Sequence, residues 1–487
     1  MLFNSIVFIF LFLPISIYVY YFLTAHRIII GARVWLVAAS LFFYAYWKLS
    51  YLPLILISMA FNFSLGTILA PRHNRVARTI DTTQKRCILA FGIVANLASL
   101  AYFKYADFMI DNYNLLFDDD LKHLKIALPL AISFFTFQQI AYLVDSYKGL
   151  TKEHDILSYM LFVTFFPQLI AGPIVAHYEM MPQFRAKKNL VLNYRHVYNG
   201  IILFVIGLFK KIVIADTFSY YATIGFDKLG NLTMFEGWFT SLSYTLQIYY
   251  DFSGYCDMAL GCALLFNIKL PINFNSPYKA LNIQDFWRRW HITLSRFLRD
   301  YLYIPLGGNR RGEAHACANV FTVFLLGGLW HGAAWTFVVW GALHGIANII
   351  CRLWHKTRIN MPKWMAWMIT FNFVNIAWIF FRAKSFSSAL KVLKAMFEGP
   401  IIEHDQWWRF KYQLPDFLEI SSNMIYAVIL LIIGCVILPN SLQIPPYLQP
   451  TSRKKKIVCA FGLAFVSVGL LCKMIIIPYT EFIYFNF

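Results

Sequence analysis

Charged side chains are scarce in this sequence, and their scarcity excludes an ordinary soluble domain. Only 14% of the 487 residues are Asp, Glu, Lys or Arg, whereas 59% are hydrophobic. A soluble globular protein carries about 25% charged residues. Residues 316–351 contain no Asp, Glu, Lys or Arg, and about 20 apolar residues suffice for one spanning helix. The composition therefore predicts an integral membrane protein that crosses the bilayer many times.

Three further absences narrow the class. The eight cysteines form no CxxC pair, so we expect buried free thiols, with neither a disulfide framework nor a bound metal. The first 23 residues lack a basic start and a small-residue cleavage site, which predicts a retained first span. We find no internal repeat and no soluble segment. Residues 1–487 are therefore expected to form a single integral membrane domain with an aromatic tail over residues 478–487.

The net charge of +19 follows the pattern of a membrane protein. Basic residues fall in short runs between apolar segments, at 71–86, 185–196, 285–313 and 352–363, whereas the 396–422 loop is rich in acidic residues. Positive charge marks the cytoplasmic side of a membrane protein. This distribution predicts contact with the lipid bilayer and no nucleic-acid partner. Counting the apolar segments between these basic runs and each end of the sequence places both termini outside the cytoplasm.

His331 lies in the middle of the uncharged stretch. Hydrocarbon penalises polar groups, so an ionisable residue there is expected to face the protein interior or a water-filled path. Histidine also gains and loses a proton near neutral pH. His331 is therefore the leading candidate for chemistry. His344 follows 13 residues later, and we interpret it mainly as a structural residue.

Basic residues next to apolar runs are candidates for donor binding. Between Asp285 and Asp300, arginines alternate with aromatic and aliphatic residues. This pattern is typical of an amphipathic helix at the membrane interface. Because arginine suits bidentate phosphate contacts, the same segment also fits a cytoplasmic mouth that attracts a phosphate-bearing donor. The candidates for that role are Arg288, Arg289, Arg296, Lys210 and Lys211.

A third polar group lies between residues 247 and 278. Asp251 and Asp257 occur among aromatic and apolar residues, and Asn273 and Asn275 follow beside prolines. Carboxylates inside a membrane are rare and are usually paired or face a cavity. Two interpretations apply: a hydrogen-bond cluster that holds a broken helix, or residues that line a path for substrate.

The motifs around these residues resemble one family closely. The segments FWRRWHITLSRFLRDYLYIPLGGN and LLGGLWHGAAWTFVVWGALHG, together with YYDFSGYCDMALG and NFNSPY, resemble the membrane-bound O-acyltransferase family. The match is to its bacterial branch of alginate and peptidoglycan O-acetyltransferases. The resemblance implies an all-α bundle of about 11 spans, with re-entrant helices around a central tunnel, in a bacterial inner membrane.

The resemblance also implies an activity. Acetyl-CoA would enter from the cytoplasm, and the acetyl group would reach an exported polysaccharide, such as alginate or peptidoglycan, with a periplasmic SGNH-hydrolase-like partner. The family histidines correspond to His331, which follows Trp330 in LWHGAAW, and to His291 in RRWHITLS. A histidine base is worth roughly 10²–10⁴ in rate, and a dry tunnel limits thioester hydrolysis. His331 is then either the general base or a transient acyl carrier, and His291 orients substrate or supports the base.

The C-terminal PYTEFIYFNF resembles a terminal aromatic motif of the same branch. In that motif a tyrosine is proposed to carry the acyl group, and the corresponding residue is Tyr484. The alternative is an aromatic anchor at the membrane interface, where Tyr and Phe are common.

Two other functions compete with acetyl transfer. One is D-alanyl transfer to a teichoic acid-type polymer, although the stretch LGGNRRG favours the acetyl branch. The other is a proton-coupled transporter that uses intramembrane His and Asp residues. A transporter is expected to contain repeated halves, and we find none.

Overall fold

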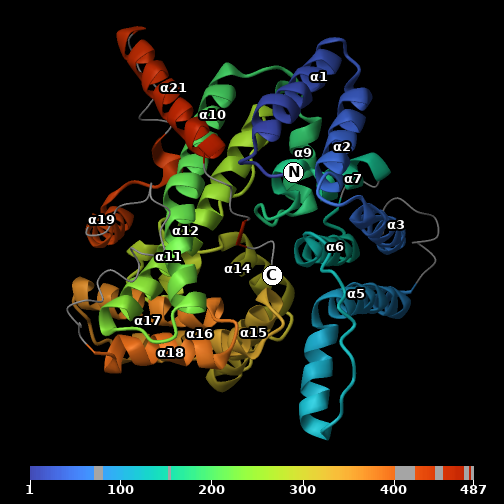
Figure 1. Cartoon of the computed structure of the whole chain (residues 1–487). Helices are drawn as coiled ribbons and strands as arrows, with labels where there is room; N and C mark the ends of the chain where they lie inside the picture. The colour runs from blue at the N-terminus through green and yellow to red at the C-terminus, as the bar shows by residue number, and fades with distance from the viewer. Residues whose placement is uncertain (71–80, 152–154, 401–422, 445–452, 477–481, 484–487) are drawn as a thin grey trace. The chain divides into compact units, whose positions relative to one another are not determined.

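The structure is a computed structural model, and it describes residues 1–70, 81–151, 155–400, 423–444, 453–476 and 482–483 (Figure 1). All regular elements within these ranges are helical, and none is a strand. The all-α prediction is therefore confirmed. Aromatic tail residue Tyr484 lies outside the described residues.

The chain forms two compact units. The first comprises residues 1–206 and 255–272, and the second residues 207–254 and 273–487. Helices α10 (Tyr194–Phe209) and α12 (Met234–Leu265) contribute residues to both. The other helices of the first unit are η1 (Phe8–Phe12), α1 (Leu13–Ala25), α2 (Ile29–Ala45), η2 (Leu49–Tyr51), α3 (Leu52–Leu69), α5 (Thr82–Phe117), α6 (Ile132–Tyr147), α7 (Ile156–Thr164), α8 (Phe166–Leu169), α9 (His177–Arg185) and η3 (Lys187–Leu190). Those of the second unit are η4 (Lys210–Ala215), α11 (Asp216–Thr223), η5 (Ile224–Lys228), η6 (Pro277–Lys279), α13 (Ile283–Arg289), α14 (Ile292–Leu298), η7 (Arg299–Tyr303), α15 (Glu313–His331), α16 (Trp335–Thr357), α17 (Lys363–Arg382), α18 (Phe386–Glu398), α19 (Asn423–Ile437), η10 (Ser441–Gln443) and α21 (Arg453–Ile476).

Several helices have the length and composition of membrane spans. In the described ranges, five are long and apolar enough to cross a bilayer: Phe8–Ala25, Leu49–Leu69, Thr82–Phe117, Trp335–Thr357 and Lys363–Arg382. Three shorter apolar helices accompany them: Ile29–Ala45, Tyr426–Ile437 and Phe461–Ile476. The multi-pass membrane protein is thus confirmed, and the number of about 11 spans stays a prediction.

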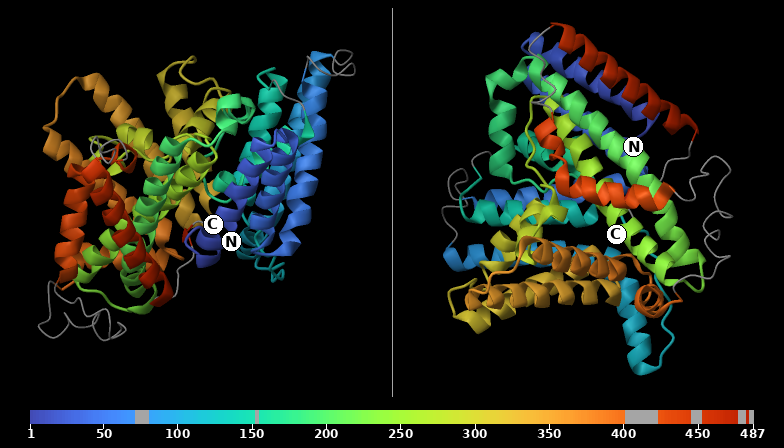
Figure 2. Two further views of the ribbon diagram at one scale, coloured as in Figure 1. Left: turned by 90° about the horizontal axis from the view of Figure 1, so that it is seen from above. Right: turned by 90° about the vertical axis from the view of Figure 1, so that its left-hand side faces the viewer.

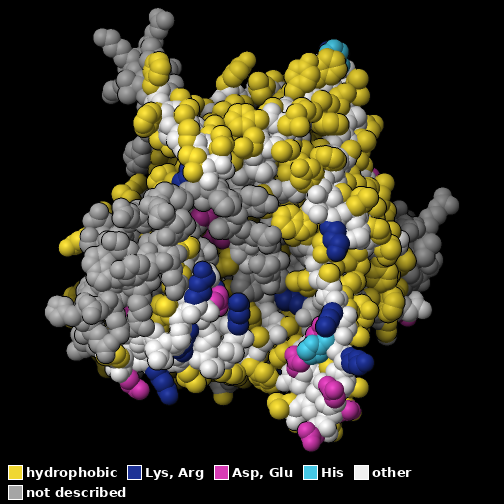
Figure 3. Space-filling view, in the orientation of Figure 1, with side chains coloured by type: hydrophobic (Ala, Val, Ile, Leu, Met, Phe, Trp, Pro, Cys, Tyr) yellow, Lys and Arg dark blue, Asp and Glu magenta, His cyan; other side chains and the backbone are white. Residues whose placement is uncertain are grey.

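In the first unit, α1, α2 and α3 run side by side (Figure 2). Hydrophobic side chains cover the surface over α1 and α2 (Figure 3). They include exposed Phe10, Tyr18 and Ile30. A large exposed apolar surface is expected where a protein faces lipid. Charged side chains gather instead at the far end of α5 (Figure 3), where Asp107 accepts from the backbone of residues 124 and 125.

Helices α7, α8, α13 and α14 are among those with at most nine residues. Nine residues extend about 14 Å, less than half of the hydrocarbon core. They are too short to span a bilayer alone and have the length expected of re-entrant pieces.

Close packing of α15 against α16 positions the histidine-bearing end of α15 (Figure 1). Gly328 and Gly341 make this approach possible. A Cβ atom on Gly328 would lie 2.3 Å from the carbonyl oxygen of Phe337, and one on Gly341 would lie 2.5 Å from that of Phe324. Small residues at such crossings let helix backbones approach closely in membranes. The glycines of the LLGGLWHG and VVWGALHG segments therefore fix where His331 lies.

Candidate functional site

Three histidines and two tryptophans of the second unit form a continuous row of rings. The ring centroids of His291 and Trp330 lie 6.4 Å apart, and those of Trp330 and His331 lie 4.9 Å apart. Trp340 continues the row, 5.2 Å from His331 and 4.7 Å from His344. All three histidines are buried. The fold thus brings together the two histidines that the sequence motifs singled out, 40 residues apart.

His291 lies at a sharp turn between α13 and α14. Its backbone is left-handed, with φ 43° and ψ 52°. This conformation costs an L-residue roughly 1–2 kcal/mol, and strain of this kind clusters at functional sites. The turn is held by two backbone hydrogen bonds to the preceding extended segment: Asn275 N–H donates to Arg289 O, and Ile292 N–H donates to Asn273 O. Hydrogen bonds made by residues before and after His291 in the sequence therefore hold its strained backbone in place.

Asn273 determines which nitrogen of His291 carries the proton. The side-chain oxygen of Asn273 accepts from the Thr293 backbone N–H at 3.2 Å and from the Thr293 hydroxyl at 3.0 Å. Because the backbone N–H can only donate, this atom must be an acceptor. His291 Nδ1, 3.1 Å away, must then donate to it. The Nε2 lone pair is left without a hydrogen-bond partner in the part of the chain that the structure describes.

His291 is neutral in the resting protein. Burial lowers the pKa of its ring to about 3, because a charged imidazolium loses its hydration. The edge of His291 meets the ring of Phe252 at a centroid distance of 4.8 Å. A neutral ring with a fixed lone pair is suited to accept a hydrogen bond. With so low a pKa, it is a poor acceptor of a full proton near pH 7.

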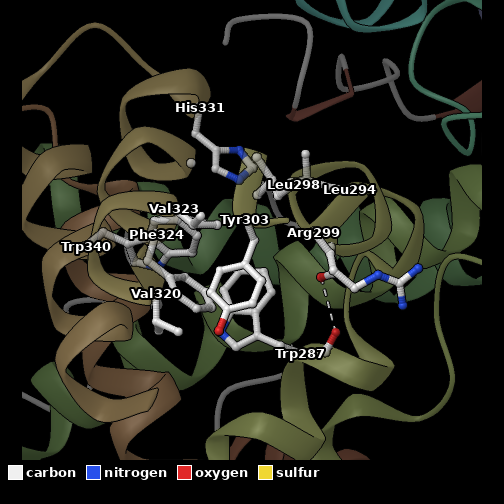
Figure 4. Close-up of a pocket in the computed structure, with 12 residues that line it drawn as sticks. Trp287, Leu294, Leu298, Arg299, Tyr303, Val320, Val323, Phe324, His331 and Trp340 are labelled. Atoms are coloured by element: carbon white, nitrogen blue, oxygen red, sulfur yellow. Dashed lines mark hydrogen bonds between the residues drawn. The ribbon is translucent and has the colours of Figure 1, made fainter. Parts of the chain in front are cut away.

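His331 lines a cavity of about 180 Å³. Its imidazole points into the space where Tyr303 and Trp287 also lie, and Arg299 is at the side (Figure 4). Apart from Ser295, the other lining residues are largely apolar: Leu294, Leu298, Val320, Val323, Phe324, Gly327 and Trp340. The indole N–H of buried Trp340 has no acceptor among the described residues. The cavity thus has a histidine and an arginine among its lining residues, in otherwise apolar surroundings.

Arg299 and Tyr303 are lining residues that the sequence interpretation did not select. With Ser295 they are spaced four residues apart, so they share one face of the helical segment formed by α14 and η7. Ser295 also fixes this segment, because its hydroxyl donates to Trp287 O at 3.2 Å (Figure 4). The four-residue spacing was the available signal. Charge alone does not distinguish the arginines of this segment, whereas helical register does.

The predicted donor arginines lie elsewhere on this segment. Arg288, Arg289 and Arg296 do not line the cavity. Arg288 is exposed. Arg289 pairs through Nε with Asp285 at 2.9 Å. Their role in donor binding stays a prediction.

His344 has a packing environment. Trp287 donates its indole N–H to His344 Nδ1 at 3.2 Å. Since an indole can only donate, the proton of the neutral His344 ring is on Nε2. The rings of Phe286, Trp340 and Phe373 surround it. These contacts agree with a structural role in holding α13, α16 and α17 together.

The polar residues near Asp251 form a separate buried cluster. Lys211 Nζ lies 2.9 Å from Asp216 and 3.0 Å from Asp251. Its ammonium is thus engaged by two carboxylates, whereas Lys210 Nζ donates to the hydroxyl of Ser441. Asp257 is buried in the first unit. Among the described residues, no group of three His, Cys, Asp or Glu side chains is placed to hold a metal ion.

Exchanging Asn273 for aspartate is expected to make activity depend on the charge of His291. An aspartate in this place still accepts from Thr293, but its negative charge stabilises the imidazolium and raises the His291 pKa. The Nε2 lone pair is then lost as pH falls, so activity declines toward acidic pH earlier than in the wild type. The measurement is the pH profile of acyl transfer. Asn275→Asp, which adds the same charge on an exposed side chain, is the control. Superimposable profiles of wild type and Asn273→Asp would contradict a need for the neutral His291 ring in acyl transfer.

The sequence profile of the membrane-bound O-acyltransferase family matches residues 17–390. The chain is 46% identical to a peptidoglycan O-acetyltransferase of Helicobacter pylori, over 100% of this chain and 98% of that protein. It is 40% identical to a probable alginate O-acetylase of Pseudomonas aeruginosa, over 82% of this chain and 75% of that protein. A teichoic acid D-alanyltransferase of Bacillus subtilis is 30% identical over 53% of this chain and 69% of that protein.

Proposed function

The chain belongs to the membrane-bound O-acyltransferase family, and we propose that it transfers acetyl groups from cytoplasmic acetyl-CoA toward a polysaccharide outside the cytoplasmic membrane. The observation that carries this proposal is the placement of His331 inside an apolar cavity with Arg299 at its side. This is the arrangement that a thioester donor and a hydroxyl acceptor require. In the proposed orientation, both termini lie outside the cytoplasm of a bacterial cell.

We propose peptidoglycan as the acceptor. A relative that aligns over 100% of this chain is named for that activity. An alginate-like exopolysaccharide is the second candidate, supported by 40% identity over 82% of the chain. D-alanyl transfer is supported less, because that relative is 30% identical over only 53% of the chain.

The cavity fits the reactive end of the donor. A space of about 180 Å³ holds the acetyl thioester and the neighbouring part of the pantetheine arm, whereas the nucleotide must lie outside it. Arg299 is exposed and pairs with Asp300 at 2.6 Å. Its planar guanidinium is suited to bidentate phosphate contact. We therefore assign Arg299 to the donor phosphates and add it to the arginines that the sequence selected.

His331 is the proposed base. The acceptor hydroxyl gives its proton to the imidazole while its oxygen attacks the thioester carbonyl carbon. The C–S bond then breaks, and the imidazolium returns the proton to the departing thiolate. His331 is the last residue of α15, and the carbonyl end of a helix stabilises positive charge that forms beside it. The indole N–H of Trp340 is the donor available to the oxyanion of the tetrahedral intermediate.

His291 is the proposed positioning residue. Its Nε2 lone pair accepts a hydrogen bond from the substrate, and its low pKa keeps that lone pair available near pH 7.

Transfer to the polysaccharide is proposed to proceed through Tyr484 and a periplasmic SGNH-hydrolase-like partner. In this route the phenolic oxygen of Tyr484 is the hydroxyl that attacks the thioester, and the resulting ester passes the acetyl group onward.

The proposal is tested with purified protein in liposomes, given acetyl-CoA labelled in the acetyl group together with peptidoglycan fragments and the partner. We expect labelled acetyl esters on the fragments. Alginate oligomers in place of peptidoglycan test the second acceptor. D-alanine loaded on a carrier protein tests for D-alanyl transfer. Absence of acetyl transfer from acetyl-CoA to either glycan would refute the proposed reaction. Proton movement across the liposome membrane without any transfer would instead favour a transporter.

A further inference from the structure

Two consecutive residues of the C-terminal tail are held by two consecutive residues of α12. The backbone N–H of Ile483 donates to Asp251 Oδ2 at 2.9 Å. The ring of Phe482 lies 5.8 Å from that of Phe252. Phe482 is only 3% exposed. Residues 482 and 483 are therefore bound inside the second unit.

The charge of the buried cluster explains why Asp251 can hold the tail. Two carboxylates, Asp216 and Asp251, share the single ammonium of Lys211. The side chain of Asp251 is 2% exposed, and a buried carboxylate is unfavourable unless charges and donors surround it. The Ile483 N–H supplies a further donor to the Asp251 carboxylate.

Backbone packing brings Lys211 and Asp251 together. Lys211 lies in the π-helical segment η4, and Asp251 lies in α12. A Cβ atom on Gly254 would lie 2.8 Å from Gly207 O and 3.2 Å from Lys211 N. The absence of a side chain at Gly254 thus lets α12 approach this segment closely enough for the ion pair.

The tail lies one ring away from the candidate site. The ring of Phe252 lies near that of Phe482 and also meets His291, at a centroid distance of 4.8 Å. His291 in turn faces Trp330, next to His331. The bound residues 482 and 483 directly precede Tyr484 in the sequence.

We infer that the Lys211–Asp251 pair and Phe252 form an intramolecular docking site for the C-terminal tail, which binds the tail through the Ile483 amide and the Phe482 ring. Docking holds residues 482 and 483, which directly precede Tyr484 in the sequence. Asp251 is then a positioning residue for acyl transfer. This consequence for transfer depends on the proposed function, whereas docking itself does not.

The test is hydrogen–deuterium exchange of C-terminal peptides that contain the Ile483 amide, measured on the full-length protein in nanodiscs. Asp251→Leu removes the acceptor, and a hydrogen bond to a charged group contributes enough that exchange is expected to become roughly 10- to 100-fold faster. Asp251→Asn retains a carbonyl oxygen and is expected to keep much of the protection. Asp216→Asn removes the other carboxylate on Lys211 and is expected to leave the Ile483 amide protected.

A second variant guards against misfolding of Asp251→Leu. Phe482→Ala changes only the chain end, removes the contact with Phe252, and is expected to accelerate exchange as well. Unchanged exchange in both Asp251→Leu and Phe482→Ala would overturn the docking site.

Acetyl transfer is measured on the same variants. If docking positions Tyr484, transfer in Asp251→Leu falls by a similar factor, while acetyl-CoA binding is retained. Exchange is measured without donor or acceptor. Exchange can therefore become faster in the variants even if the wild-type protein transfers no acetyl group. That combination would refute the proposed function and leave the docking site supported.

Discussion

Replacing His331 with alanine is expected to lower acetyl transfer by roughly 10²- to 10⁴-fold, the usual contribution of a positioned general base. The hydroxyl acceptor then attacks the thioester with no group to remove its proton. His331 is 3% exposed and lies against Trp330, Trp340 and Phe381. Among the residues that the structure describes, no other histidine lines the cavity.

Four measurements separate this loss from unfolding. The thermal transition in detergent and the affinity for acetyl-CoA should stay near the wild-type values. His315→Ala removes a histidine from the opposite end of the same helix α15, where Nε2 contacts only Leu306 O among the interactions described, and is expected to retain activity. Added imidazole is expected to restore part of the His331→Ala activity, because deletion of the ring enlarges the existing cavity. Full activity in a folded His331→Ala protein would exclude His331 as the base.

Replacing Tyr484 with phenylalanine is expected to abolish transfer to the glycan. The substitution keeps the aromatic ring, so anchoring at a membrane interface is retained. It removes the phenolic oxygen, the only atom of this side chain that can form an ester with the acetyl group. The measurement is labelled acetyl on the glycan, with Tyr479→Phe, a second tyrosine of the same tail, as the matched control. Wild-type transfer by Tyr484→Phe would show that this tyrosine is not the carrier.

The Tyr484→Phe variant also distinguishes the two roles open to His331. A histidine that carries the acetyl group would still be acetylated when the tyrosine cannot accept it, and intact-protein mass spectrometry would detect one added acetyl group. A histidine that only removes a proton would leave the protein unlabelled. Adding His331→Ala to this variant identifies the labelled residue.

Much of the site was predictable from local sequence. His331 stands out because residues 316–351 contain no Asp, Glu, Lys or Arg. An ionisable residue in a membrane segment normally faces the protein interior or a water-filled path. His291 was found through its motif. The arginines were predicted as a group, and only the helical register placed Arg299 and Tyr303 at the cavity. Lys211 was assigned to donor phosphates from its charge. In the structure its ammonium lies between two carboxylates, contacts that come from separate segments of the chain.

The sequence by itself determined the membrane class, the all-helical fold and the two motif histidines, because composition and short motifs are local properties. Only the tertiary structure decided the tautomer of His291, the row of rings that joins it to His331, and the binding of the tail by Asp251. Each of these depends on partners 18 to 232 residues away in the chain. The direction of a hydrogen bond and the sharing of one ammonium between two carboxylates are properties of the packed chain, and no window of sequence contains them.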